Sequence, residues 1–143
     1  MSNNPQFADA TVIAAVAAAC ALLNGGFLEV YSGSQPADAN TAVTSQVKLA
    51  TLGLGSPAFG TPSASGSAGS RVVTATATAI TEDDNAAATG TATWFRSYRS
   101  DGVTVVHDGS VGTSGADLNL STASILAGGT VAVSAFTITH PET

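Results

Sequence analysis

The glycine pair Gly25-Gly26 divides the chain into two regions of different character, and this division constrains the fold more than any other feature. Before the pair, apolar side chains recur at spacings of three and four residues and predict a helix over residues 9–24. Asp9 can cap the start of this helix, and the glycines can end it because glycine accepts the left-handed conformation. Most of the helix is alanine, which favours helix and leaves room for another backbone to approach.

After the glycine pair, short segments rich in β-branched and aromatic residues alternate with Gly, Pro, Asn and Asp. Residues 71–80 give the clearest strand pattern, with β-branched residues alternating with alanine. The other predicted strands are residues 27–31, 48–54, 90–99, 103–107 and 130–140. Turn residues recur about every 8–12 positions, which predicts a mainly β fold, an antiparallel β-sandwich or jelly roll with one N-terminal α-helix. The predicted strands do not alternate with helices, which excludes a doubly wound parallel α/β sheet.

The length of 143 residues fits a single domain. Residues 1–7 are polar and contain a proline, and we expect an extended N-terminal arm ahead of a domain spanning residues 8–143. Residues 55–70 are rich in Gly, Pro and Ser and are predicted to be a long loop, of the length that is usually functional or disordered. The arm and this loop are candidate partner-binding segments.

Composition and charge exclude several classes of function. Four basic and ten acidic residues give a net charge of −6, which disfavours nucleic-acid binding through phosphate neutralisation. The single cysteine, Cys20, allows neither an intrachain disulfide nor a cysteine zinc site, and its alanine-rich surroundings predict a small buried side chain. The apolar run over residues 10–23 is short for a membrane span and follows no Lys or Arg, so we expect neither an anchor nor a signal peptide, but folding in a cytosol.

The sequence offers no constellation of catalytic or ligand residues. Most carboxylates stand beside Gly, Ser or Asn, as in turns, and the acidic run over residues 82–85 lacks the spacing of a calcium loop. His107-Asp108 with Ser110 suggests a general base and a nucleophile, but neighbours on a strand point to opposite faces. No phosphate-binding glycine motif or Gly-x-Ser-x-Gly elbow is present. We therefore expect a protein that is not an enzyme and binds no cofactor or metal.

One cluster combines aromatic and basic side chains. On a strand, Trp94, Arg96 and Tyr98 share one face, while Phe95 and Arg99 share the other. The aromatics either fill a core that has few other large residues or form a contact patch, since Trp, Tyr and Arg dominate interface energetics. The first role is favoured, and the two are compatible.

Three passages carry a family resemblance: LEVYSGSQPADAN (28–40), GTATWFRSYRSDGVTVVHDGSVGTSGADLNL (90–120) and STASILAGGTVAVSAFTIT (121–139). They resemble a group of small tailed-bacteriophage virion proteins. The resemblance implies a structural virion component, with a head decoration (cement) protein favoured over a tail or fibre part. It implies the major capsid protein as partner, self-association with a trimer favoured, and a place on the capsid exterior after synthesis in the host cytoplasm. It carries over no catalytic residue.

Two alternatives to decoration remain open. One is a tail- or fibre-associated protein that adheres to host glycans through Trp94, Tyr98 and turn carboxylates. The other is a virion glycan hydrolase, disfavoured because no pair of carboxylates is evident. A sequence pI of about 4.4 suits a capsid exterior rather than a DNA-lined interior. The candidate partner-binding residues are Pro5, Phe7, Phe59, Trp94, Arg96 and Tyr98.

Overall fold

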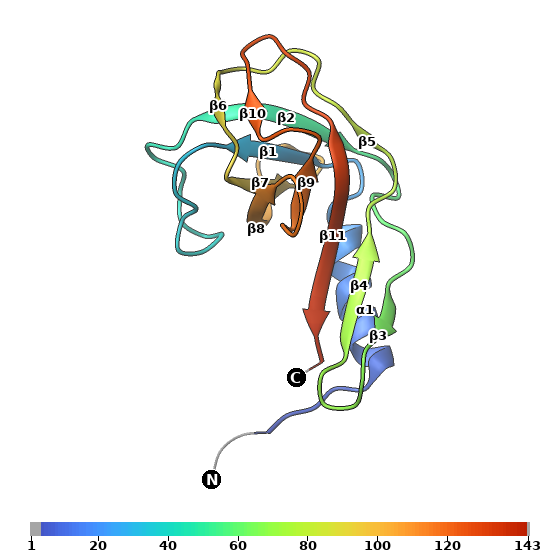
Figure 1. Ribbon diagram of the computed structural model, residues 1–143. Coiled ribbons are helices and arrows are strands. Elements are labelled where there is room, and N and C mark those ends of the chain that lie inside the picture. The colour runs from blue at the N-terminus through green and yellow to red at the C-terminus, as the bar shows by residue number, and fades with distance from the viewer. Residues whose placement is uncertain (1–3, 143) are drawn as a thin grey trace.

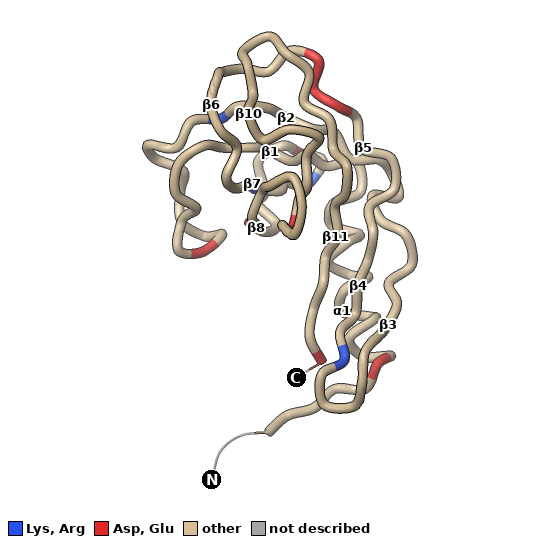
Figure 2. The backbone as a smooth tube through the Cα atoms, in the orientation of Figure 1, with Lys and Arg blue, Asp and Glu red and all other residues tan. Residues whose placement is uncertain are grey.

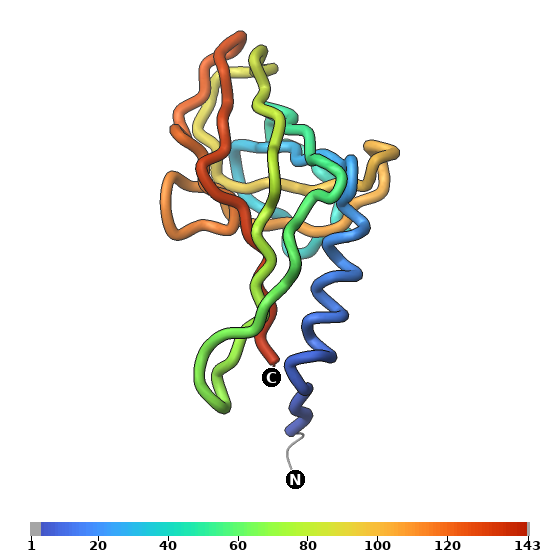
Figure 3. The backbone as a smooth tube through the Cα atoms, turned by 90° about the vertical axis from the view of Figure 1, so that its right-hand side faces the viewer, coloured from blue at the N-terminus to red at the C-terminus, as the bar shows by residue number. Residues whose placement is uncertain are grey.

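The computed structural model describes residues 4–142, which form a wider body and a narrow limb (Figures 1 and 3). The limb consists of the helix α1 (Asp9–Ala21), the strands β3 (Ser63–Ser65) and β4 (Val72–Thr76), and the second half of β11 (Val133–Pro141). The protein is mainly β with one helix, as the sequence predicted.

The remaining strands form the body. They are β1 (Phe27–Tyr31), β2 (Lys48–Leu54), β5 (Ile80–Thr81), β6 (Gly90–Thr91), β7 (Trp94–Tyr98), β8 (Val105–Gly112), β9 (Leu118–Leu120) and β10 (Ser124–Ile125). The predicted segments 71–80 and 90–99 each contain two shorter strands instead of one long strand. The strands predicted at residues 90–99 and 103–107 form a hairpin, in which β7 pairs with β8 in antiparallel register across the turn at Gly102.

Nine strands form one sheet, in the order β3-β4-β11-β9-β8-β7-β1-β2-β5, and β10 pairs separately with β6. The sheet curls strongly, so that β4 and β11 run across the direction of β1, β2 and β7 (Figure 1). The described pairings are antiparallel except for β8 with β9, which are parallel. The expected all-antiparallel arrangement is corrected at this one pair, because β8 and β9 are joined by a loop that returns the chain in the same direction.

The helix begins at Asp9 as predicted and ends at Ala21, three residues before the predicted end. Gly25 then adopts a φ of 67°, which favours glycine. The carboxylate of Asp9 does not cap the helix but binds Arg71 at the start of β4. Cys20 is buried, as its alanine-rich surroundings predicted. Within the described residues, no helix has the length and hydropathy needed to cross a membrane.

Residues 55–70 are not a free loop, and this prediction is corrected. Ala58 and Phe59 are buried, Phe59 forms a bridge with Ala77, and the segment then continues into β3. The ring of Phe59 lies 5.3 Å from the ring of Phe136 in the core. One aromatic side chain and a short strand therefore fix this segment to the rest of the fold, although its composition resembles that of a loop.

The Asp108-Gly109 pair lies inside β8 and is not a turn as its sequence suggests. A Cβ atom at position 109 would lie 2.5 Å from Cε1 of Phe95, so the glycine is needed for the close approach of this ring. The last strand, β11, has a register shift against β9 between Val133 and Ala135. Of the predicted arm, residues 1–3 lie outside the described residues, while Phe7 donates its N–H to the carbonyl oxygen of Glu142 at 3.3 Å.

Candidate functional site

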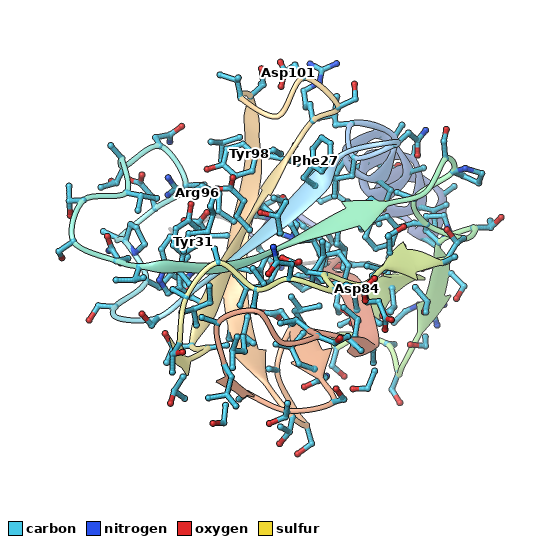
Figure 4. All side chains as sticks on the ribbon, turned by 90° about the horizontal axis from the view of Figure 1, so that it is seen from above. Phe27, Tyr31, Asp84, Arg96, Tyr98 and Asp101 are labelled. Carbon is cyan, nitrogen blue, oxygen red and sulfur yellow. The ribbon has the colours of Figure 1, made fainter. Side chains whose placement is uncertain are left out.

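The aromatic and basic side chains singled out in the sequence gather on one face of the body sheet. The register places Tyr31 of β1 opposite Trp94 of β7, and Asp108 of β8 opposite Arg96. Figure 4 shows Tyr31, Arg96 and Tyr98 on the same side of these strands. The sheet therefore collects stacked rings and opposite charges in one cluster.

Arg96 and Asp108 form a buried, two-point ion pair. Nε of Arg96 lies 2.7 Å from Oδ1 of Asp108, Nη2 lies 2.8 Å from Oδ2, and each side chain is only 4% exposed. The bond to Asp108 raises the pKa of the Arg96 guanidinium. Because both carboxylate oxygens are bound, Asp108 is engaged by the arginine and is not a free base.

Trp94 lies close to both this arginine and Tyr31. The Arg96 guanidinium carbon is 5.6 Å from the centre of the indole ring, and the Tyr31 ring is stacked on Trp94 at 4.5 Å with 13° between the planes. The hydroxyl of Tyr31 donates to Oε2 of Glu29 at 2.6 Å. Burial, followed by the bond to Glu29, raises the pKa of Tyr31. The indole is 1% exposed, and its N–H has no hydrogen-bond partner among the described residues.

Residues 32–47, which join β1 to β2, lie against this cluster. None of them is buried, and the segment contains no helix or strand. Two bonds join it to the strand beneath: Nη2 of Arg96 donates to the carbonyl of Asp38 at 3.4 Å, and the hydroxyl of Thr93 donates to the carbonyl of Gly33 at 2.6 Å. The segment therefore meets the cluster through its own backbone carbonyls.

The structure does not bring the six candidate partner-binding residues together. Trp94 and Arg96 are buried in the cluster, and Phe59 is buried in the core, so these three side chains are not accessible on the surface. The preference for an interior role of the aromatics agrees with this placement. Tyr98 is half-buried, while Pro5 and Phe7 are exposed near the tip of the limb. Glycan stacking on Trp94 would require this ring, which is 1% exposed and stacked on Tyr31, to become accessible.

His107 lies on the opposite face of β8 from Asp108, as the strand alternation predicted. Its Nδ1 is 2.5 Å from the Ser97 hydroxyl, and its ring meets that of Phe95 edge-on at 5.2 Å. Burial lowers the pKa of His107. Ser110 instead bonds to Asp117, whose Oδ2 accepts from its hydroxyl at 3.0 Å and from its N–H at 2.9 Å. The residues suggested as a general base and a nucleophile are therefore bound to other partners.

The body also contains a small cavity and an acidic turn. The cavity, of about 190 Å³, is lined by His107, Asp108, Asp117, Thr137, Ile138 and Thr139.

In the acidic run over residues 82–85, Asp83 accepts hydrogen bonds from the N–H groups of Asn85 and Thr51, at 2.9 Å each. Asp83 therefore shapes a turn and fixes this turn to β2. No group of three His, Cys, Asp or Glu suited to a metal ion occurs in the part of the chain described.

The limb has a different kind of surface, which the sequence analysis did not identify. The outer face of β3, β4 and β11 carries a set of hydroxyl side chains: Ser63, Ser65, Thr74, Thr76, Thr137 and Thr139. Ser63, Thr74 and Thr139 pair across the three strands, Thr76 pairs with Thr137, and Ser65 pairs with Val72. The hydroxyls of Thr74 and Thr139 are 3.2 Å apart. The alternation of Thr and Ala over residues 74–79 was the signal that could have identified this face.

The charges of the limb are confined to its tip (Figure 2). There Arg71 binds both oxygens of Asp9 and lies 3.8 Å from Oε2 of Glu142. The bond to Arg71 lowers the pKa of Asp9, while the neighbouring Asp9 raises the pKa of Glu142. Between this cluster and the body, both outer faces of the limb are uncharged.

Comparison with known proteins adds no relative. No family model, no curated protein and no solved structure matches this chain.

Proposed function

We propose that this chain is a structural protein of a tailed-bacteriophage virion, a capsid decoration protein that binds the outer surface of the major capsid lattice and stabilises the head. The observation that carries this proposal is the uncharged hydroxyl face of β3, β4 and β11. Its side chains are short, so another protein backbone can approach closely, and docking there removes no charge from water.

The arrangement of the reactive side chains supports a binding role. Asp108 is engaged by Arg96, Ser110 by Asp117, and His107 by Ser97. These contacts stabilise the sheet. The Ser97 hydroxyl faces the ring of His107, but Ser97 is fully buried, so this pair is closed to a substrate. The resemblance of residues 28–40 and 90–139 to small phage virion proteins supports the same conclusion.

A repeated lattice makes weak docking effective. Each capsid presents many identical sites, and a decoration protein that joins neighbouring subunits gains affinity through effective concentration. Self-association strengthens this effect, because one oligomer then occupies several sites together. The proposed partner is the major capsid protein, at the exterior of the particle.

Binding of the full chain to purified particles tests the proposal. We expect hundreds of copies per particle, measured by quantitative mass spectrometry. A variant with Ser65→Glu and Thr139→Glu should lower occupancy by about tenfold or more, because two charges are then desolvated on docking. The control carries Ala42→Glu and Ser45→Glu, which add the same charge to exposed positions of the body.

Two results would count against decoration. A few copies per particle would favour the tail or fibre alternative, and equal occupancy of the two charged variants would exclude the hydroxyl face as the docking surface. Deleting residues 1–7 gives a second test. We expect an unchanged fold and weaker retention on the capsid, measured as the fraction of protein that remains bound after washing.

A further inference from the structure

The helix α1 has two apolar sides, and its own chain covers only one. Val12, Val16 and Cys20 face the sheet and are buried. A second series of exposed residues, Ala10, Ala14, Ala17 and Ala21, runs along the outer side at spacings of four, three and four residues. Phe7 and Asn24, three residues beyond each end of this series and outside the helix, are exposed as well. This spacing is that of a helix–helix seam. A helix that is apolar on all sides is normally buried on all sides.

A groove lies at one end of this seam and an exposed ring lies at the other. The groove has a volume of about 380 Å³, and its walls include Cys20, Ala21, Asn24, Pro57, Phe59 and Pro62. Phe7, at the opposite end, is 54% exposed. The rise of a helix separates the two ends by about 20 Å. Because its N–H is bound to the carbonyl of Glu142, Phe7 is held at the tip and cannot reach its own groove.

We propose that two copies of this chain pair their α1 helices antiparallel about a two-fold axis, with Phe7 of each copy filling the groove of the other. The spacing of the seam reads the same in both directions. Phe7 therefore faces Asn24 of the second copy, and Ala10 faces Ala21. At the centre Ala14 faces Ala17, where the short side chains let the helices approach to about 8 Å.

Charge favours a second copy as the occupant. Each chain carries a net charge of −6, so most contacts between two copies are repulsive. The seam carries no charged residue, and Asp9 at its edge is already bound to Arg71. A self-complementary uncharged surface thus allows association where a charged surface of the same protein does not.

The size of the seam sets the expected affinity. A seam about 20 Å long with two inserted rings buries less than about 1,200 Å² of surface in total. This area is near the low end for specific protein–protein interfaces. We expect a dissociation constant in the micromolar range or weaker, and not a permanent dimer. The two-fold pairing differs from the trimer expected from the sequence, and it leaves the hydroxyl face free for other contacts.

Sedimentation equilibrium of the full chain tests the association. We expect a reversible monomer–dimer equilibrium between about 10 μM and 1 mM. Ala14→Glu should weaken it at least about a hundredfold, because each seam then buries two unpaired carboxylates, and Phe7→Ala should weaken it about tenfold through loss of the inserted ring. Ala42→Glu, with the same charge change in the body, should leave it unchanged. Circular dichroism and thermal unfolding establish that the variants are folded.

Disulfide trapping tests the orientation. In a Cys20→Ala background, Ala10→Cys and Ala21→Cys proteins should cross-link when mixed, because these positions face each other. Ala10→Cys alone should not cross-link, since its two copies are then separated by about 16 Å along the helices. A monomer over the whole concentration range, an Ala14→Glu variant that still dimerises, or self-linking of Ala10→Cys would each overturn the proposal. These measurements contain no capsid, so their failure is separate from failure of the decoration role.

Discussion

The body and the limb achieve order by different means. The body is defined by a few large or charged side chains, such as the Tyr31–Trp94–Arg96 stack and the ion pair with Asp108. The limb is made mostly of Ala, Ser and Thr, and it is held by strand pairing and by a helix packed closely against the strands. The comparison shows that a chain with few large residues can concentrate them in one region and build the other from backbone hydrogen bonds and small side chains.

Breaking the ion pair of the body should give the largest effect on stability. Asp108→Ala leaves the buried Arg96 without a counter-charge, and we expect a loss of about 3–5 kcal/mol in the free energy of unfolding. Urea denaturation measures this change. The double variant Arg96→Met with Asp108→Leu should recover most of the loss, because it removes both charges. A loss below about 1 kcal/mol in the single variant would mean that large charged groups do not define the body.

A smaller effect is expected from adding one methyl group beside Phe95. Gly109→Ala places a Cβ atom 2.5 Å from the ring, and we expect a loss of about 1–3 kcal/mol as the ring or the strand shifts. The matched control is Gly112→Ala in the same strand, where the nearest atom would be 3.4 Å away. Equal stability of the two variants, measured by thermal unfolding, would contradict the close packing described.

His107 of the body and Glu142 of the limb should contribute to the acid response of stability with opposite sign. Burial lowers the pKa of His107 in the folded body, so the unfolded chain binds more protons as the pH falls below about 7. The free energy of unfolding should therefore decrease between about pH 7 and 5, by at most about 1.4 kcal/mol per pH unit. His107→Gln should flatten this slope. An identical slope in the variant would exclude His107 as its source.

At the tip of the limb, Asp9 raises the pKa of Glu142. The folded state then takes up this proton before the unfolded state does, so the contribution of Glu142 to stability increases as the pH falls through its folded pKa. A carbon-detected NMR titration of the side-chain carboxyls measures the shift directly. Asp9→Asn should move the pKa of Glu142 down toward its ordinary value, and an unchanged pKa would contradict the coupling.

The smallest effect is expected on the hydroxyl face of the limb. Thr139→Val removes one hydroxyl from an exposed position while keeping the β-branched shape, so stability should stay within about 0.5 kcal/mol of the original. A matched change inside the body, Ser97→Val, should cost more, because it leaves His107 without its hydroxyl partner. Similar costs at the two positions would remove the distinction between the regions.

The sequence predicted the elements better than their connections. The apolar spacing in the alanine-rich segment predicted the helix. The strands predicted at residues 27–31 and 48–54 match β1 and β2. The parallel pairing of β8 with β9 and the position of Asp108-Gly109 inside a strand were missed. Both depend on distant packing: Gly109 is required by the ring of Phe95, which lies on another strand.

The candidate site was predicted only in part. Alternation placed Trp94, Arg96 and Tyr98 on one face, which the strand β7 confirms. The favoured interior role of the aromatics agrees with the burial of Trp94. The burial of Arg96 did not follow from the pattern, because its partner Asp108 lies on another strand. Phe59 was interpreted as part of a loop because its neighbours are Gly, Pro and Ser. Local composition does not show that its ring packs against Phe136, which is distant in sequence.

The bond between Phe7 and Glu142 brings the first and last described parts of the chain together at the tip of the limb. A peptide or enzyme fused at either end would therefore emerge from the same point of the molecule, well away from the body (Figure 1). The same proximity makes the chain suited to circular permutation, with a short linker across the old ends and new ends opened in residues 32–47.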